Sequence, residues 1–177
     1  MYKNIESGIK KNNIKFIERT LKALRQHGRA LNADEISYDR TLFINACVGV
    51  LLVPSSTIYD HLPEEMIDNW GISSDKITME DKDGNNLEEL KTVKEVVRHL
   101  RNAIAHNHFD FDSGDDSQCG CIPIENIDFV DINMYNKKTK RKNKEKIVHN
   151  FGVRLTFDEF KRFIENVAKY TIQEIPN

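Results

Sequence analysis

The segment from Leu42 to Val53 is apolar around most of its circumference when it is wound as a helix. A helix that is hydrophobic on every side must be covered by other elements, so this segment predicts a central, buried helix. Pro54 cannot continue the helix and is expected to end it. Residues 14–24 have helical apolar spacing and supply part of the cover. No apolar run is long enough to span a bilayer, so we expect no membrane partner.

Two capping boxes predict the starts of two further helices, over residues 92–106 and roughly 157–173. In a capping box a hydroxyl residue and a glutamate three positions later satisfy free backbone N–H groups at the helix start. The two pairs are Thr92 with Glu95 and Thr156 with Glu159.

The stretch between these helices has strand spacing instead of helical spacing. Its apolar positions are Ile127, Phe129, Ile132, Val153 and Leu155. Residues 71–91 are polar and turn-rich, and we interpret them as a connection. We therefore expect a single domain over residues 1–177 that is mainly α. It would be an up-and-down helical bundle with a small β-hairpin inserted at about 124–155, between the last two helices.

The charge of the chain is distributed in blocks. Its 177 residues carry a formal net charge of −2, which excludes a globally basic nucleic-acid coat. Residues 58–90 and 110–136 are acidic, whereas residues 91–109 and 137–146 are basic. The three cysteines and the start of the chain, which lacks a signal-like apolar stretch, favour a reducing, cytoplasmic location.

Helix 92–106 has two distinct faces when its residues are projected at about 100° each. The core face carries Val93, Val96, Val97, Leu100 and Ile104. The opposite face carries Glu95, Arg98, Arg101, Asn102, Ala105 and His106, with His99 at its edge. Arg101 and His106 diverge by about 140° and would flank a groove. A two-fold partner would bring the arginine of one chain toward the histidine of the other.

The sequence from Arg101 to His106, R-N-A-I-A-H, matches the R-N-x-x-x-H form of a motif found in the HEPN superfamily. This superfamily comprises small helical ribonuclease and nucleotide-binding domains. The segments FINACVGVLLVP, LRNAIAHNHFDF and VRLTFDEFKRF also resemble its plasmid- and defence-associated branch. The resemblance covers roughly residues 10–172.

The resemblance implies an all-α bundle that forms a homodimer through the 92–106 helix face and cleaves RNA without a metal or other cofactor. The ribose 2′-OH would attack the adjacent phosphorus and leave a 2′,3′-cyclic phosphate and a 5′-OH. A neutral imidazole transfers protons near pH 7, and a guanidinium pairs bidentately with phosphate. We therefore expect His106 and Arg101 to be catalytic and Asn102 to support them. The capping role of Glu95 explains that residue better than a catalytic one.

The basic side chains near the motif and in the 137–146 run are candidates for substrate binding. They are Arg98, His99, Lys137, Lys138, Lys140, Arg141 and Lys142. Such a run can hold a phosphate backbone without sequence preference. An equally good interpretation is an exposed hairpin tip that its charge keeps soluble.

Two further patterns have a metal-binding interpretation that we do not favour. The alternating His106, His108, Asp110 and Asp112 would share a face of an extended segment, but a helix exit followed by an acidic loop explains them better. Cys119 and Cys121 lack the second ligand pair of a structural zinc site.

The partners expected of an active enzyme are RNA, a second copy of the chain and an antitoxin. Some members of the branch carry R-x4-H-x-Y, whose tyrosine a partner antitoxin modifies, and here that position is His108. The alternatives are a HEPN dimer without catalysis, acting as an RNA-binding, nucleotide-binding or regulatory module, and a plain protein-interaction bundle.

Overall fold

The computed structural model describes residues 11–23, 36–52, 60–81, 83–113, 124–132 and 150–174. The helices in this part of the chain are one over residues 11–23, α2 (Ile36–Leu52), α4 (Val93–Ala105) and α5 (Phe157–Glu174). The strands are β1 (Ile77–Glu80), β2 (Phe109–Ser113), β3 (Ile124–Ile132) and β4 (Asn150–Thr156). Short 3₁₀ turns lie at Ile67–Trp70, Ser74–Lys76 and Glu88–Leu90.

The four strands form one antiparallel sheet in the order β1-β4-β3-β2. Phe129 of β3 lies opposite Val153 of β4 on one side and Phe109 of β2 on the other. Val153 in turn lies opposite Ile77 of β1. Apolar side chains therefore line up across the sheet on one face.

This sheet corrects the fold class expected from the sequence. The chain is not an up-and-down helical bundle with an appended hairpin, because the expected β3–β4 pair is the centre of a four-stranded sheet. The polar connection expected over residues 71–91 contains β1, and the acidic loop expected after His106 is β2. The two missed strands are short and rich in polar residues. β1 is stabilised by pairing with the distant β4, and β2 by pairing with β3, the next strand along the chain.

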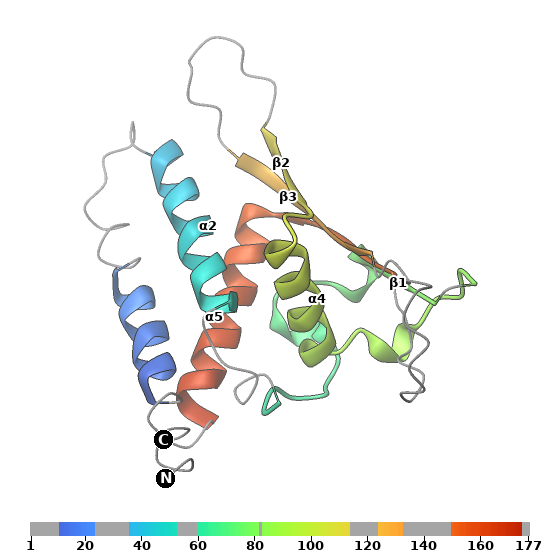
Figure 1. The fold of residues 1–177 in the computed structure, drawn as a ribbon, viewed down its shortest axis with the longest axis horizontal. Coiled ribbons are helices and arrows are strands. Elements are labelled where there is room, and N and C mark those ends of the chain that lie inside the picture. The colour runs from blue at the N-terminus through green and yellow to red at the C-terminus, as the bar shows by residue number, and fades with distance from the viewer. Residues whose placement is uncertain are drawn as a thin grey trace, which may run out of the picture.

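The helices lie on one side of the sheet (Figure 1). Helix α4 packs on β3, and α5 packs on β3 and β4. The buried side chains of the covered face are Ile77, Met79, Ile127, Phe129, Phe151, Val153 and Leu155. Helix α2 contacts both α4 and α5. The described part of the chain is thus two layers around one apolar core.

Helix α2 contributes buried side chains to the apolar core. Its described core residues are Ile44, Cys47, Val50 and Leu51. Val48 and Leu52 are half-buried and pack against the same core, and Phe16 of the 11–23 helix lies beside Gly49. Leu42, by contrast, is 44% exposed.

Candidate functional site

Helix α4 begins and ends at sequence-encoded caps. The Thr92 hydroxyl accepts a hydrogen bond from the Glu95 backbone N–H at 3.4 Å. At the other end, Asn107 adopts a left-handed φ of 57°. The N–H of His108 then donates to the carbonyl of Ala103 at 2.7 Å, and the N–H of Asn107 donates to that of Ile104 at 3.1 Å. This Schellman geometry stops α4 at His106 and turns the chain into β2.

The core face predicted for α4 is confirmed. Its five apolar residues are all buried: Val93, Val96, Val97, Leu100 and Ile104. Because they anchor the helix, the polar face has a fixed direction relative to the sheet and to α2.

A buried polar network joins α4 to β3. Asp131, 4% exposed, accepts hydrogen bonds at Oδ2 from His99 Nδ1 at 2.7 Å and from Asn102 Nδ2 at 3.0 Å. The His99 ring is fully buried and stacks on Phe151, with ring centroids 4.9 Å apart and planes 4° apart. Arg98 Nη2 lies 3.2 Å from His99 Nε2.

The network favours an ionised Asp131. Burial raises the pKa of this carboxyl, but hydrogen bonds from His99 and Asn102 and the nearby positive charge of Arg98 lower it further than burial raises it. The pKa of Asp131 therefore lies below its ordinary value. A carboxylate only accepts hydrogen bonds, so its partners must present N–H groups to it.

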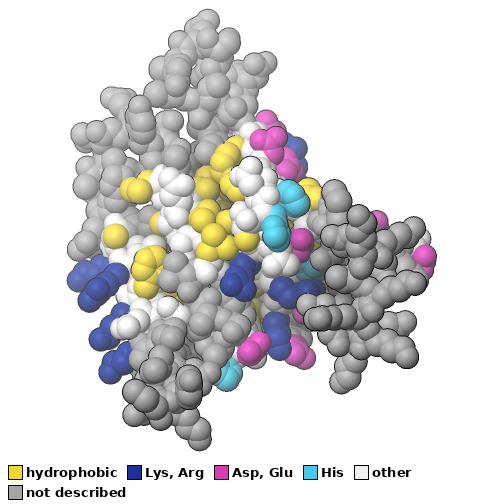
Figure 2. Space-filling view, in the orientation of Figure 1, with side chains coloured by type: hydrophobic (Ala, Val, Ile, Leu, Met, Phe, Trp, Pro, Cys, Tyr) yellow, Lys and Arg dark blue, Asp and Glu magenta, His cyan; other side chains and the backbone are white. Residues whose placement is uncertain are grey.

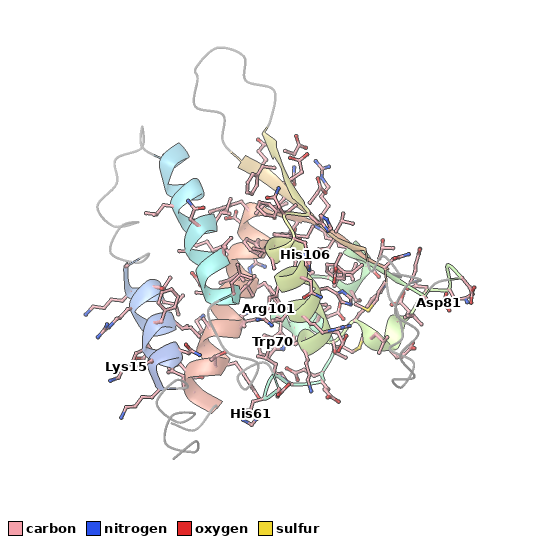
Figure 3. All side chains as sticks on the ribbon, in the orientation of Figure 1. Lys15, His61, Trp70, Asp81, Arg101 and His106 are labelled. Carbon is pink, nitrogen blue, oxygen red and sulfur yellow. The ribbon has the colours of Figure 1, made fainter. Side chains whose placement is uncertain are left out.

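Arg101 and His106 lie on the accessible part of α4 (Figure 3). Arg101 is half-buried, and His106 is exposed at the C-terminal end of the helix. The His106 ring is 6.0 Å from the ring of the exposed His108. The arginine and the histidine of the motif are therefore both accessible, unlike the residues of the core face.

The surface around this end of α4 is partly apolar. Figure 2 shows hydrophobic side chains gathered over α2 and the adjoining part of α4, bordered by histidine and by lysine and arginine side chains. Ala105 is exposed on α4, as is Leu42 on α2. The motif residues thus adjoin a surface with few charges.

The structure separates the other site residues predicted from the sequence. Arg98 is half-buried and forms an ion pair with Glu95. His99 lies inside the α4–β3 interface, where both ring nitrogens have partners. Lys137, Lys138, Lys140, Arg141 and Lys142 lie outside the described residues, as do Cys119 and Cys121.

Asp131 is the site residue that the sequence interpretation missed. Ile127 and Phe129 alternate on the covered face of β3, and continuing that alternation leads to Asp131. A carboxylate at an inward position requires hydrogen-bond partners, which could have been sought on the neighbouring helix.

Other candidate sites contribute no chemistry near the motif. Within the described ranges, no three His, Cys, Asp or Glu side chains are grouped so that they could hold a metal ion. No helix among those residues has the length and apolarity to cross a membrane. A shallow pocket of about 290 Å³ is lined by Asn126 of β3, Arg154 and Thr156 of β4, and Lys76 of the 3₁₀ turn before β1. Its cations already pair with carboxylates: Lys76 with Glu159, and Arg154 with Asp112 and Asp128.

Comparison with known proteins identifies the family. No curated protein and no solved structure matches the chain significantly. A family model described as HEPN pEK499 p136 matches residues 1–177. The match extends over the full sequence, and the chain therefore belongs to the HEPN pEK499 p136 family.

Proposed function

We propose that the protein is a metal-independent endoribonuclease that acts as a homodimer, with Arg101 and His106 as catalytic residues and Asn102 in support. The observation that carries this proposal is the R-N-x-x-x-H motif at the accessible end of an anchored helix, in a chain of the HEPN family. The core face accounts for the folding role of α4, whereas His106 and Arg101 have no place in the apolar core.

The side chains at the motif suit attack by a ribose 2′-OH on the adjacent phosphorus. The His106 imidazole takes the hydroxyl proton as the 2′-oxygen forms its bond to phosphorus. The bond from phosphorus to the 5′-oxygen breaks, and that oxygen takes a proton from solvent water. Arg101 stabilises the negative charge that develops on the phosphoryl oxygens. The products are a 2′,3′-cyclic phosphate and a 5′-OH.

A homodimer would complete each site with an arginine from one copy and a histidine from the other. The apolar surface that extends from α2 to the end of α4 adjoins the motif, and a second copy would cover it. In a two-fold dimer the same patch meets itself, so residues at its border face their counterparts. Arg101 of one copy would then approach His106 of the other, and two sites would form in one cleft.

Substrate binding is assigned to the positive charges beside this cleft. Arg98 lies on α4 and is half-buried, and we propose that it adds positive charge near the motif beside its ion pair with Glu95. The basic run follows β3 in the sequence, after Ile132, and precedes β4. We propose that it contributes non-specific phosphate contacts. His99, which is buried, is not part of this surface.

The experiment is an RNA cleavage assay in the presence of a chelator. The wild-type protein is expected to cleave, whereas Arg101→Ala and His106→Ala each lower the rate by about a hundredfold or more, since each removes one general acid–base or charge-stabilising group. His108→Ala and Arg154→Ala are matched controls, because both residues are exposed and lie outside the proposed catalytic set.

The outcomes distinguish the candidate functions. The proposal is supported if the wild type and both controls cleave RNA in the presence of chelator and only Arg101→Ala and His106→Ala lose this activity. Loss in His108→Ala but not in His106→Ala overturns the assignment of the histidine. A wild-type dimer that binds RNA without cleaving it would identify a non-catalytic HEPN module instead.

A further inference from the structure

The interface between α4 and β3 contains polar groups that the proposed mechanism leaves unused. Within the described part of the chain, the buried polar or charged residues are Lys91, His99, Asp131 and Thr171. His99 and Asp131 are bonded to each other, and Asp131 also binds Asn102, which belongs to the motif. A carboxylate in an apolar interface is costly unless its oxygens are hydrogen-bonded.

The hydrogen positions in this network follow from the chemistry of its members. Asp131 accepts, so His99 must carry its proton on Nδ1 and Asn102 must turn its NH₂ group toward the carboxylate. The guanidinium of Arg98 only donates, so His99 Nε2 accepts a hydrogen bond from it. The amide of Asn102 therefore has a single orientation.

That orientation decides which atom Asn102 offers to the rest of the site. Its Nδ2 is committed to Asp131, so Oδ1 occupies the other branch of the same planar amide and points away from the carboxylate. Asn102 is half-buried, with Arg101 as its neighbour in the chain and His106 one turn later on the same helix. Its carbonyl oxygen is the atom available to a substrate there.

We infer that Asp131, held by His99, is a positioning residue that fixes the Asn102 amide so that its carbonyl oxygen is presented as a hydrogen-bond acceptor toward a ribose hydroxyl of the RNA. The inference rests on the proposed function, because it gives Asn102 a role in RNA cleavage. It also assigns a role to β3, which holds the motif helix in place through Asp131. The stacking of His99 on Phe151 of β4 prevents the pair from rotating.

The first test observes the amide directly and requires no cleavage. In ¹⁵N-labelled wild-type protein, the side-chain NH₂ of Asn102 is expected to be ordered and to exchange with water more slowly than that of the exposed Asn107. The His99 ring is expected to carry its proton on Nδ1. An Asn102 amide as mobile as that of Asn107, or a His99 ring with its proton on Nε2, overturns the inference. This measurement on the wild type does not depend on any variant folding.

The second test is a double-mutant cycle on cleavage kinetics, with Asp131→Asn, Asn102→Ala and the double variant. If Asp131 acts through Asn102, Asp131→Asn lowers kcat about tenfold with little change in KM, and has no further effect in the Asn102→Ala background. An equal loss in both backgrounds, or no loss at all, overturns the inference. Asp110→Asn on the exposed β2 is the matched control and is expected to leave kcat unchanged.

The two tests separate this inference from the proposed function. If the wild-type protein does not cleave RNA, the proposed function fails, and the NMR result still decides whether Asp131 orients Asn102. If the protein cleaves RNA and the cycle shows no coupling, the proposed function stands and the role of Asp131 is rejected.

Discussion

Asn107 is the only non-glycine with a positive φ in the described residues, and it sets the point at which α4 ends. A side chain with a Cβ in the left-handed region costs roughly 1–2 kcal/mol, which asparagine tolerates better than other residues and glycine avoids. The bond from His108 to Ala103 depends on this conformation and so does the placement of His106, the last residue before the turn.

The effect of a substitution at Asn107 on the free energy of unfolding is therefore expected to depend on how well the new residue tolerates a left-handed backbone. Asn107→Gly should leave the free energy of unfolding within about 0.5 kcal/mol of the wild type, whereas Asn107→Val should lower it by at least about 1 kcal/mol. Urea unfolding measures both. Equal stabilities of the two variants would mean that the cap does not define the end of α4.

At the scale of elements, the predictable parts are those whose signals are local. Both halves of the capping box formed by Thr156 and Glu159 are present, with hydrogen bonds of 2.9 to 3.2 Å. Helix α5 begins at Phe157, directly after Thr156. β1 was missed because only Ile77 and Met79 mark it as a strand, and its stability comes from β4, which lies far along the chain. For the same reason the sequence did not indicate Asp131 as the partner of His99, because the two residues are 32 positions apart and meet only when β3 packs on α4.

The α4–β3 interface gives the stability of the fold a defined pH dependence. A carboxyl whose folded pKa is lowered stabilises the fold above its unfolded pKa, near 4, and that contribution is lost as the pH falls through the folded pKa. Asp131→Asn should therefore be less stable than the wild type at pH 7, and the difference should narrow below about pH 4. Chemical denaturation across this range tests it, with Asp110→Asn as the control. A constant gap at every pH would contradict this account.

At the scale of the whole molecule, the sheet supports a helical layer whose outer surface carries the motif (Figures 1 and 3). The sequence alone indicates the motif and its helix, but not the sheet that holds them. In the proposed homodimer, a second copy would cover the hydrophobic surface that Figure 2 shows over α2 and α4.

If each site of the proposed dimer takes its arginine from one subunit and its histidine from the other, mixing two inactive variants should restore activity. Arg101→Ala and His106→Ala are each expected to be inactive, but subunits unfolded together and refolded as a mixture should regain about a quarter of the wild-type rate. Half of the dimers are then mixed, and each mixed dimer has one site with both native residues. No recovery, with mixed dimers present, would place the arginine and histidine of each site in a single chain.

The central proposal is that this protein cleaves RNA by attack of a 2′-OH group of the RNA on the adjacent phosphorus. The most direct measurement is the chemistry of the ends produced from a defined RNA with excess chelator, beside the same RNA carrying a single 2′-deoxy residue at the cleaved position. The account predicts a 2′,3′-cyclic phosphate and a 5′-OH from the first RNA and no cleavage at the deoxy position of the second. Cleavage at the deoxy position, or products that end in a 5′-phosphate, would contradict it.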